Sequence, residues 1–484
     1  MINKKIIFKA IGILLYIFVG FFLLCFLISF YYKENDQPTF IISIILCAGI
    51  ASLFFYAGKG AKHTISRRDG YIIVATAWIV SSLIGMSPYL ISGYINNVND
   101  AFFETISGFT STGATILDNI ESFPHGLLFW RSVTQWIGGL GIVFFTIAVL
   151  PMIGTGGIKL FAAEATGPTH DKVHSRISVT AKWIWMIYIG MTVAETILLR
   201  FSGMGLFDSL CHALTTCSTG GFSTKQESIA SFHSPRIEYI ITIFMFLSGI
   251  NYTLLYTTLL KLRIKKLFYN TEFRWYFCIV ILSTLGITTG LYFSESGNLE
   301  NLFRRALFQV VSIQSSTGFM SDDYMLWMPP LWMILCLVMI IGSCAGSTAG
   351  GIKCIRLTIM CKVAHNQFKQ IIHPNAVFPV RINRQVIPDS TKTIVLAFMS
   401  AYLVILFFGW LILMALGMNF TEAFGSVITC LSNSGPALGS CGPAYSFSAI
   451  PTAAKWVCSF LMLAGRLELF TILILFMPSF WKKL

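Results

Sequence analysis

Of the 484 residues, 55% are apolar and only 11% are charged, whereas ordinary soluble domains carry roughly 25% charged residues. This composition excludes a water-soluble globule and indicates that lipid covers most of the surface. The formal net charge of +13 does not indicate nucleic-acid binding, because the basic residues are distributed between apolar segments along the whole chain.

The apolar segments are long enough for membrane-spanning helices, which need about 20 residues each. In chain order we predict ten spans, over residues 10–32, 39–57, 71–93, 126–151, 183–203, 237–260, 275–293, 328–360, 394–417 and 452–480. Residues 328–360 and 452–480 are too long to form single straight spans. Lys4, Lys5 and Lys9 before the first run resemble a signal peptide, but no small-residue cleavage site precedes Tyr31, so we expect a retained helix.

Lysine and arginine are concentrated at the chain ends and after the even-numbered spans, while acidic residues predominate on the other side. Positive loops face the cytoplasm. We therefore expect both termini to be cytoplasmic, and an acidic outer face that concentrates cations.

One pattern recurs on the outer side after the third, fifth, seventh and ninth spans. A short, partly apolar stretch is followed by a small polar tripeptide that ends in glycine. The four tripeptides are Ser111-Thr112-Gly113, Ser218-Thr219-Gly220, Ser316-Thr317-Gly318 and Asn433-Ser434-Gly435. Internal repeats of this kind are typical of membrane transport proteins.

The repeated pattern fits a pore loop, because non-helical backbone at membrane depth must be shielded by protein or line water. A short helix followed by an extended segment can direct carbonyl oxygens at a dehydrated cation, and glycine supplies the positive φ that this requires. Ordinary tight turns between helices remain the alternative.

Ten consecutive small residues, Gly342–Gly351, interrupt the span 328–360. Glycine destabilises a helix interior by roughly 1 kcal/mol relative to alanine, so we expect a broken helix beside a permeation path; a close-packing face is the alternative.

Arg466 lies deep in the last span, where an unpaired charge is costly. We expect it to donate to carbonyl groups of 342–351, and Glu468 to pair with another helix; a snorkelling or structurally paired arginine is the alternative.

Other polar or small residues inside spans carry less information. Gln135, Gly138, Gly139 and Gly141 in QWIGGLG, and Asn251 in SGINY, are interpreted as packing positions. The twelve cysteines contain no C-x-x-C pair, and most lie inside spans. Cys430 and Cys441 could meet near the outer face, but we expect buried free thiols. We find no transition-metal site and no catalytic constellation, so the protein is not expected to be an enzyme.

The motifs SGFTSTGAT, CSTGGFST, SSTGFM, LSNSGPALG and GSCAGSTAGGIK occur in this order. With them the chain resembles the TrkH/KtrB superfamily of potassium transporters, and its two additional N-terminal spans resemble the TrkH/TrkG branch. The resemblance implies an all-α polytopic membrane fold with two peripheral helices and four M1–pore helix–M2 repeats around one pore. The corresponding ranges are 1–57 for the peripheral helices and 58–152, 153–262, 263–365 and 366–484 for the repeats.

The resemblance also implies roles for residues. The four tripeptides would form a potassium selectivity filter with one glycine per repeat, in which Asn433-Ser434 departs from the Ser-Thr pattern. The intramembrane gate would comprise Gly342, Ala345, Gly346, Ser347, Thr348, Gly350, Gly351 and Arg466. A homodimer in the bacterial inner membrane is implied, together with a cytosolic TrkA-like nucleotide-binding subunit, because this chain has no G-x-G-x-x-G of its own.

These observations predict potassium uptake through a gated, channel-like pore without a bound cofactor. A sodium- or proton-coupled potassium symporter is the first alternative, and intramembrane acids such as Glu195 and Glu468 are where coupling would be tested. A membrane enzyme or sensor is the second alternative, which the missing catalytic constellation and soluble domain disfavour.

Overall fold

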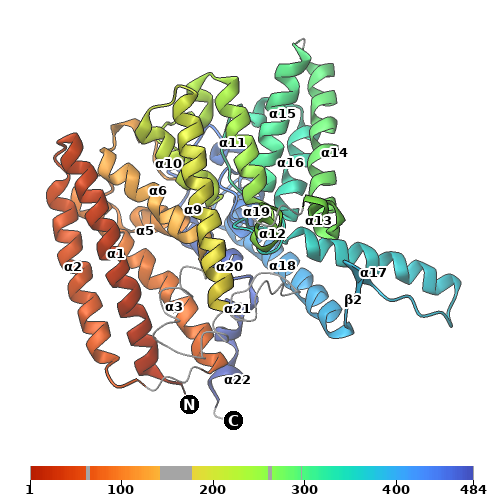
Figure 1. Ribbon diagram of the computed structural model, residues 1–484, viewed down its shortest axis with the longest axis horizontal. Helices are drawn as coiled ribbons and strands as arrows, with labels where there is room; N and C mark the ends of the chain where they lie inside the picture. The colour runs from red at the N-terminus through yellow and green to blue at the C-terminus, as the bar shows by residue number, and fades with distance from the viewer. Residues whose placement is uncertain (1, 62–65, 142–176, 260–263, 296, 483–484) are drawn as a thin grey trace.

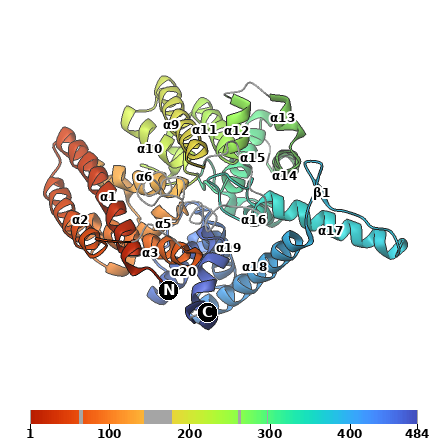
Figure 2. The ribbon, with the colours of Figure 1, turned by 60° about the horizontal axis from the view of Figure 1, so that its bottom comes forward.

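The structure is a computed structural model that describes residues 2–61, 66–141, 177–259, 264–295 and 297–482. In these ranges the regular secondary structure is almost entirely helical, and the helices stand side by side in one bundle (Figures 1 and 2). Both termini lie at the same end of the bundle, opposite the connection between α14 (Thr271–Ser294) and α15 (Leu299–Gln314). The predicted all-α class is confirmed.

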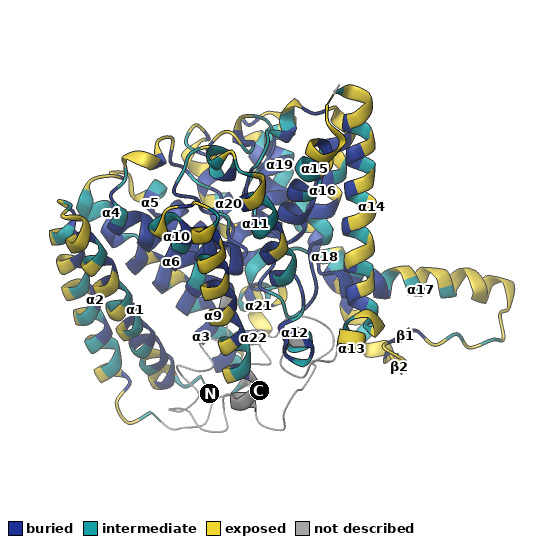
Figure 3. Cartoon of the chain, turned by 45° about the horizontal axis from the view of Figure 1, so that its top comes forward, coloured by how far each residue is buried: buried dark blue, intermediate teal, exposed yellow. Residues whose placement is uncertain are grey.

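Six of the described helices are long and apolar enough to cross a membrane: α1 (Lys4–Tyr32), α2 (Gln37–Ala57), α3 (Arg67–Gly85) continued by α4 (Ser87–Ser92), α9 (Ile177–Phe201), α14 and α18 (Asp389–Ala415). Their outward faces expose large apolar side chains, for example Leu53 at 68% and Leu282 at 70%. Burial is concentrated at the centre of the bundle instead (Figure 3). Such a surface is stable only in lipid, so this is a multi-pass membrane protein.

Further spans are broken. Helices α11 (Pro235–Ser248) and α12 (Tyr252–Leu259) meet at a bend of 107°, and α20 (Thr452–Arg466) and α21 (Phe470–Leu473) at one of 110°. Helices α16 (Pro329–Ile341) and α17 (Cys354–Ile372) are separated by a non-helical segment. The predicted interruptions of 328–360 and 452–480 are therefore confirmed.

The prediction of one continuous span over 237–260 is wrong. Asn251 starts a new helix, because its side-chain oxygen accepts hydrogen bonds from the backbone N–H groups of Thr253 (2.8 Å) and Leu254 (3.2 Å). Helix α6 (His125–Leu140) begins the predicted span 126–151, whose residues 142–151 lie outside the described ranges. The predicted boundaries at 152/153 and 262/263 also lie outside them.

Four helices too short to span lie inside the bundle: α5 (Val98–Phe109), α10 (Leu206–Cys217), α15 and α19 (Phe420–Ser432). Their C-terminal halves are buried, and each carries an acidic residue in its first turn. The remaining elements are peripheral: α13 (Ile264–Tyr269), α22 (Pro478–Trp481), a two-stranded antiparallel ribbon of β1 (Arg381–Ile382) and β2 (Gln385–Val386), and short 3-10 turns. Helix α17 extends away from the other helices (Figures 1 and 2).

Candidate functional site

The four tripeptide loops begin at the C-terminal ends of the four short buried helices. In each loop two residues, separated by one, have positive φ, and the second is always glycine. The pairs are Ser111 and Gly113 (52° and 84°), Thr219 and Gly221 (55° and 78°), Ser316 and Gly318 (55° and 81°), and Asn433 and Gly435 (53° and 88°). The four loops therefore share one backbone conformation.

The same four glycines contact neighbouring loops in a closed cycle. A Cβ atom on Gly113 would overlap the carbonyl oxygen of Gly220, one on Gly221 that of Thr317, and one on Gly318 that of Ser434. The cycle closes because a Cβ on Gly435 would lie 3.0 Å from the carbonyl oxygen of Thr112. Four loops from one chain thus form a ring, and glycine is needed both for the conformation and for the close approach.

The second loop is shifted by one residue from the predicted register. The N–H of Gly220 bonds to the carbonyl of Thr215 (2.8 Å), as that of Thr112 bonds to Ser107 (2.9 Å). Gly220 is therefore the counterpart of Thr112, and Gly221 is the counterpart of Gly113. The expectation that Ser218-Thr219-Gly220 is equivalent to the other tripeptides is wrong by one position, because the Gly220-Gly221 pair left two alignments open.

The environment of the ring favours cations. The carboxyl ends of α5, α10, α15 and α19 all lead into it, and the C-terminal end of a helix carries about half a negative charge. None of the tripeptides contains a charged residue. The ring therefore offers backbone carbonyls and helix dipoles, which suit a monovalent cation stripped of water.

The broken segment 342–353 lies against the ends of these short helices. The Ser343 hydroxyl donates to the carbonyl of Gln314 (2.8 Å), and the Thr348 hydroxyl donates to that of Cys217 (3.1 Å). The N–H of Gly350 donates to the side chain of Ser316 in the third loop (2.7 Å). Positive φ at Gly342, Gly346 and Gly351 (67°, 74° and 76°) explains why no helix continues here.

Arg466, at the end of α20, connects this segment to α6. Its guanidinium donates to the carbonyl of Thr348 (2.8 Å) and to those of Gly138 (2.5 Å) and Gly139 (2.9 Å). Glu468 does not pair with it; its carboxylate accepts from Arg356 of α17. Helices α6 and α20 and the broken segment 342–353 therefore meet at Arg466, whose guanidinium replaces lost hydration with backbone carbonyls.

Two contacts to the broken segment were missed by the sequence reasoning. The Asn251 side chain donates to the carbonyl of Ala345 (2.7 Å), and the Glu272 carboxylate accepts from the N–H groups of Ala345 (2.6 Å) and Ile355 (3.2 Å). The packing interpretation of Asn251 is therefore wrong. The only signal for Asn251 was a polar residue inside an apolar run, two positions after Gly249.

The QWIGGLG segment at the end of α6 makes both close packing contacts and a side-chain hydrogen bond. The interpretation as packing positions fits Gly138 and Gly139, where a Cβ atom would overlap the backbone of Phe109 and of Ser218, respectively. The packing interpretation does not fit Gln135, whose side-chain amide donates to the carbonyl of Gly220 (2.7 Å).

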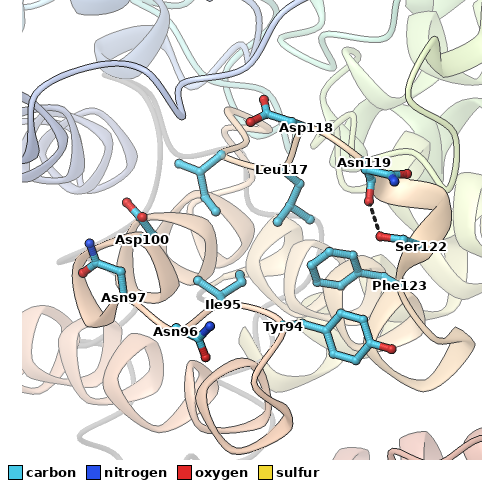
Figure 4. A pocket seen from close by; sticks show the side chains of 11 residues that line it. Tyr94, Ile95, Asn96, Asn97, Asp100, Leu117, Asp118, Asn119, Ser122 and Phe123 are labelled. Carbon is cyan, nitrogen blue, oxygen red and sulfur yellow. Dashed lines mark hydrogen bonds between the residues drawn. The ribbon is translucent and has the colours of Figure 1, made fainter.

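A cavity of about 370 Å³ lies between residues 94–100 and 116–123 (Figure 4). Tyr94, Ile95 and Phe123 point into it, while Asp100 and Asp118 stand at its edge. Both carboxylates are engaged: Asp100 pairs with Lys455 (2.6 Å), and Asp118 accepts from Ser448 (3.1 Å). The cavity is therefore lined by residues of the segment 94–123, whose two carboxylates contact Lys455 of α20 and Ser448.

The twelve cysteines all lie in the described part of the chain and are free thiols, ten of them buried. The expectation of free thiols is confirmed.

The bundle and its ring define a class: a polytopic α-helical membrane protein with four inward loops around one axis. A model of the TrkH family, described as cation transport protein, matches residues 36–483. The chain is 37% identical over 481 residues to the Trk system potassium uptake protein TrkH of Escherichia coli (strain K12), covering 98% of this chain and 99% of that protein. It is 34% identical over 464 residues to TrkG of the same organism, covering 94% of each.

Among solved structures, the crystal structure of the potassium transporter TrkH from Vibrio parahaemolyticus superimposes with a TM-score of 0.89. The sequence identity is 33%, and 99% of each chain is covered. The protein therefore belongs to the TrkH family.

Proposed function

We propose that this protein takes up potassium across the bacterial inner membrane through a gated, channel-like pore. The observation that carries the proposal is the closed ring of four glycine-containing loops at the ends of four buried helices. The naming of its relatives as potassium uptake proteins supports the choice of ion.

In this proposal the ion loses its water at the ring and is coordinated by carbonyl oxygens of the four loops. The glycines Gly113, Gly221, Gly318 and Gly435 allow the four loops to approach one another. The four M1–pore helix–M2 repeats are the proposed units that place one loop each.

The gate of the proposal is the segment 342–353, held closed by Arg466. Ser347 and Gly346 lie at its turn, where Gly346 contacts the Asn251 side chain. Opening would require Arg466 to release the carbonyl of Thr348 and the segment to move away from the third loop.

Regulation and assembly are further parts of the proposal. A homodimer and a cytosolic TrkA-like nucleotide-binding subunit follow from the family resemblance. The projecting helix α17 exposes Phe368 (69%), Ile371 (74%) and Ile372 (71%), which supports a protein contact on this side. Both termini are proposed to be cytoplasmic.

The test is cation flux into proteoliposomes with potassium, rubidium, sodium and lithium. Wild type is compared with Gly113→Ser and Gly318→Ser, since a side chain at either position would strike a carbonyl of the next loop. We expect potassium and rubidium to exceed sodium in wild type, and each substitution to reduce that preference at least about tenfold, the ratio that corresponds to 1.4 kcal/mol.

Gly190→Ser is the matched control, because Gly190 lies on the lipid-facing helix α9 with ordinary φ and nothing within 4 Å of a Cβ atom. It should keep the wild-type preference. Absence of flux, or a preference unaffected by Gly113→Ser and Gly318→Ser, would contradict the proposed filter.

One observation supports the symporter alternative. Glu195 of α9 is fully buried, one carboxylate oxygen lies 3.5 Å from Cys217 Sγ, and the other has no hydrogen-bond partner among the described residues. Protonatable groups inside a membrane are often part of ion coupling. If Glu195→Gln retained potassium flux but lost its dependence on a proton gradient, coupling would be favoured; an unchanged dependence would reject this role.

A further inference from the structure

The second loop of the ring differs from the other three in how its backbone is supported. Gln135 of α6 is fully buried, and its side-chain amide bridges the loop on both sides of Gly221. Its Nε2 donates to the carbonyl of Gly220 (2.7 Å), and its Oε1 accepts from the N–H of Phe222 (3.0 Å).

The counterparts of Gly220 in the other loops carry hydroxyl groups that are hydrogen-bonded to the residue two positions earlier. The Thr112 hydroxyl lies 2.7 Å from that of Thr110, and the Thr317 hydroxyl lies 2.7 Å from that of Ser315. The fourth counterpart is Ser434. Only the second loop has glycine here, and a Cβ on Gly220 would overlap the Gln135 side chain. Gln135 therefore fills the space that a side chain occupies in the other loops.

Helix α6 supports the same loop one turn earlier. Arg131 donates to the carbonyl of Ser223 (2.8 Å) and lies over the ring of Phe222 at 3.6 Å. Its charge is balanced by the buried carboxylate of Glu104 (2.7 Å). Residues four apart share one helix face, so a single face of α6 fixes residues 220–223.

We propose that Gln135 is a specificity-determining positioning residue, which sets the direction of the Gly220 carbonyl in the ring and is matched to the glycine at position 220. This inference rests on the proposed function of the ring as a filter. A carbonyl whose oxygen accepts a hydrogen bond from the Gln135 amide cannot turn freely to fit a smaller ion, so loss of the amide should relax the preference for potassium over sodium.

The first test uses Gln135→Leu and Gln135→Glu in the same flux assay, with size-exclusion profiles to check folding. Gln135→Leu removes the donor and should lower the potassium-to-sodium ratio about fivefold, the change expected for one ordinary hydrogen bond. Gln135→Glu places an acceptor against the Gly220 carbonyl when ionised. The potassium-to-sodium ratio of Gln135→Glu should be low at about pH 8. It should recover toward about pH 5, where a buried carboxyl is protonated and can donate to the Gly220 carbonyl.

The second test exploits the steric match. Gly220→Thr alone should reduce flux, because the new side chain meets Gln135, and Gln135→Ala in the same chain should restore it. Gln309→Leu is the matched control. Gln309 is also buried and donates to a backbone carbonyl (2.9 Å), but that carbonyl belongs to Asp322 in an outer loop, so the ratio should not change.

The outcomes separate the two proposals. If Gly113→Ser lowers the ratio while Gln135→Leu and Gln135→Glu leave it unchanged at both pH values, the role of Gln135 is refuted and the filter stands. If Gly113→Ser also has no effect, the filter itself fails and the inference falls with it. If Gln135→Leu does not fold, the role of Gln135 is tested by the other two variants. It is supported by pH-dependent recovery of the ratio in Gln135→Glu and by restored flux in the double variant, and it is refuted if neither is seen.

Discussion

Individual residues of the ring adopt a conformation that is unfavourable for most side chains. Ser111, Thr219, Ser316 and Asn433 all have φ between 52° and 55°, at a cost of roughly 1–2 kcal/mol for a non-glycine residue. Asparagine tolerates this region best. In Asn433 the side chain also donates to the Thr112 hydroxyl (2.9 Å), so this departure from the Ser-Thr pattern joins the fourth loop to the first.

Arg466 gives a prediction at the same scale. Arg466→Ala removes three carbonyl contacts between α20, α6 and the segment 342–353. We expect higher potassium flux in the absence of any regulatory partner, because the proposed gate loses the crosslink that holds it closed. Arg466→Lys should be intermediate, since an ammonium lacks the planar fork that reaches several carbonyls. Flux equal to wild type in both variants would show that Arg466 is structural only.

At the scale of elements, the break after α20 is stabilised by an ion pair. Arg356 of α17 pairs with Glu468 and lies over the Phe398 ring at 3.9 Å. Glu468 and Leu469 have positive φ (51° and 53°) where the chain bends. Removing one partner leaves a partly buried charge, so Arg356→Met should destabilise the protein by about 3 kcal/mol, while Arg356→Met with Glu468→Leu should regain most of it. Thermal unfolding in detergent measures both; equal losses would contradict the prediction.

The start of α19 is expected to be stabilised in a pH-dependent way. Glu422 accepts from the backbone N–H of Asn419 (3.4 Å), and hydrogen bonding from Ser440 and Asn419 lowers the pKa of its carboxyl. A lowered pKa stabilises the fold above the ordinary value of about 4.3, and this contribution is lost as the pH falls through the folded-state pKa. Glu422→Gln should therefore lower the unfolding temperature at neutral pH and have less effect in acid. A difference independent of pH would contradict this assignment.

For the whole molecule, the charge distribution predicts the orientation. Both termini lie at one end of the bundle (Figure 1), and the basic segments predict that this end is cytoplasmic. A fluorescent protein fused to the C-terminus should fluoresce in cells, and alkaline phosphatase fused there should be inactive. Active phosphatase in this fusion would show that the termini lie outside the cytoplasm, and the direction of the proposed pore would then be reversed.

The length and apolar character of α1, α2 and α18 are visible in the sequence by themselves, because a spanning helix satisfies its own backbone and needs only about 20 apolar residues. The four glycine loops and the break in 342–351 were likewise predictable, since glycine in an apolar run has few structural explanations. The register of the second loop and the contacts of Gln135, Asn251 and Glu272 with distant segments were decided only by the tertiary structure. Each depends on a hydrogen bond or a close approach between residues at least 70 positions apart or on a choice between adjacent glycines, which local propensity does not determine.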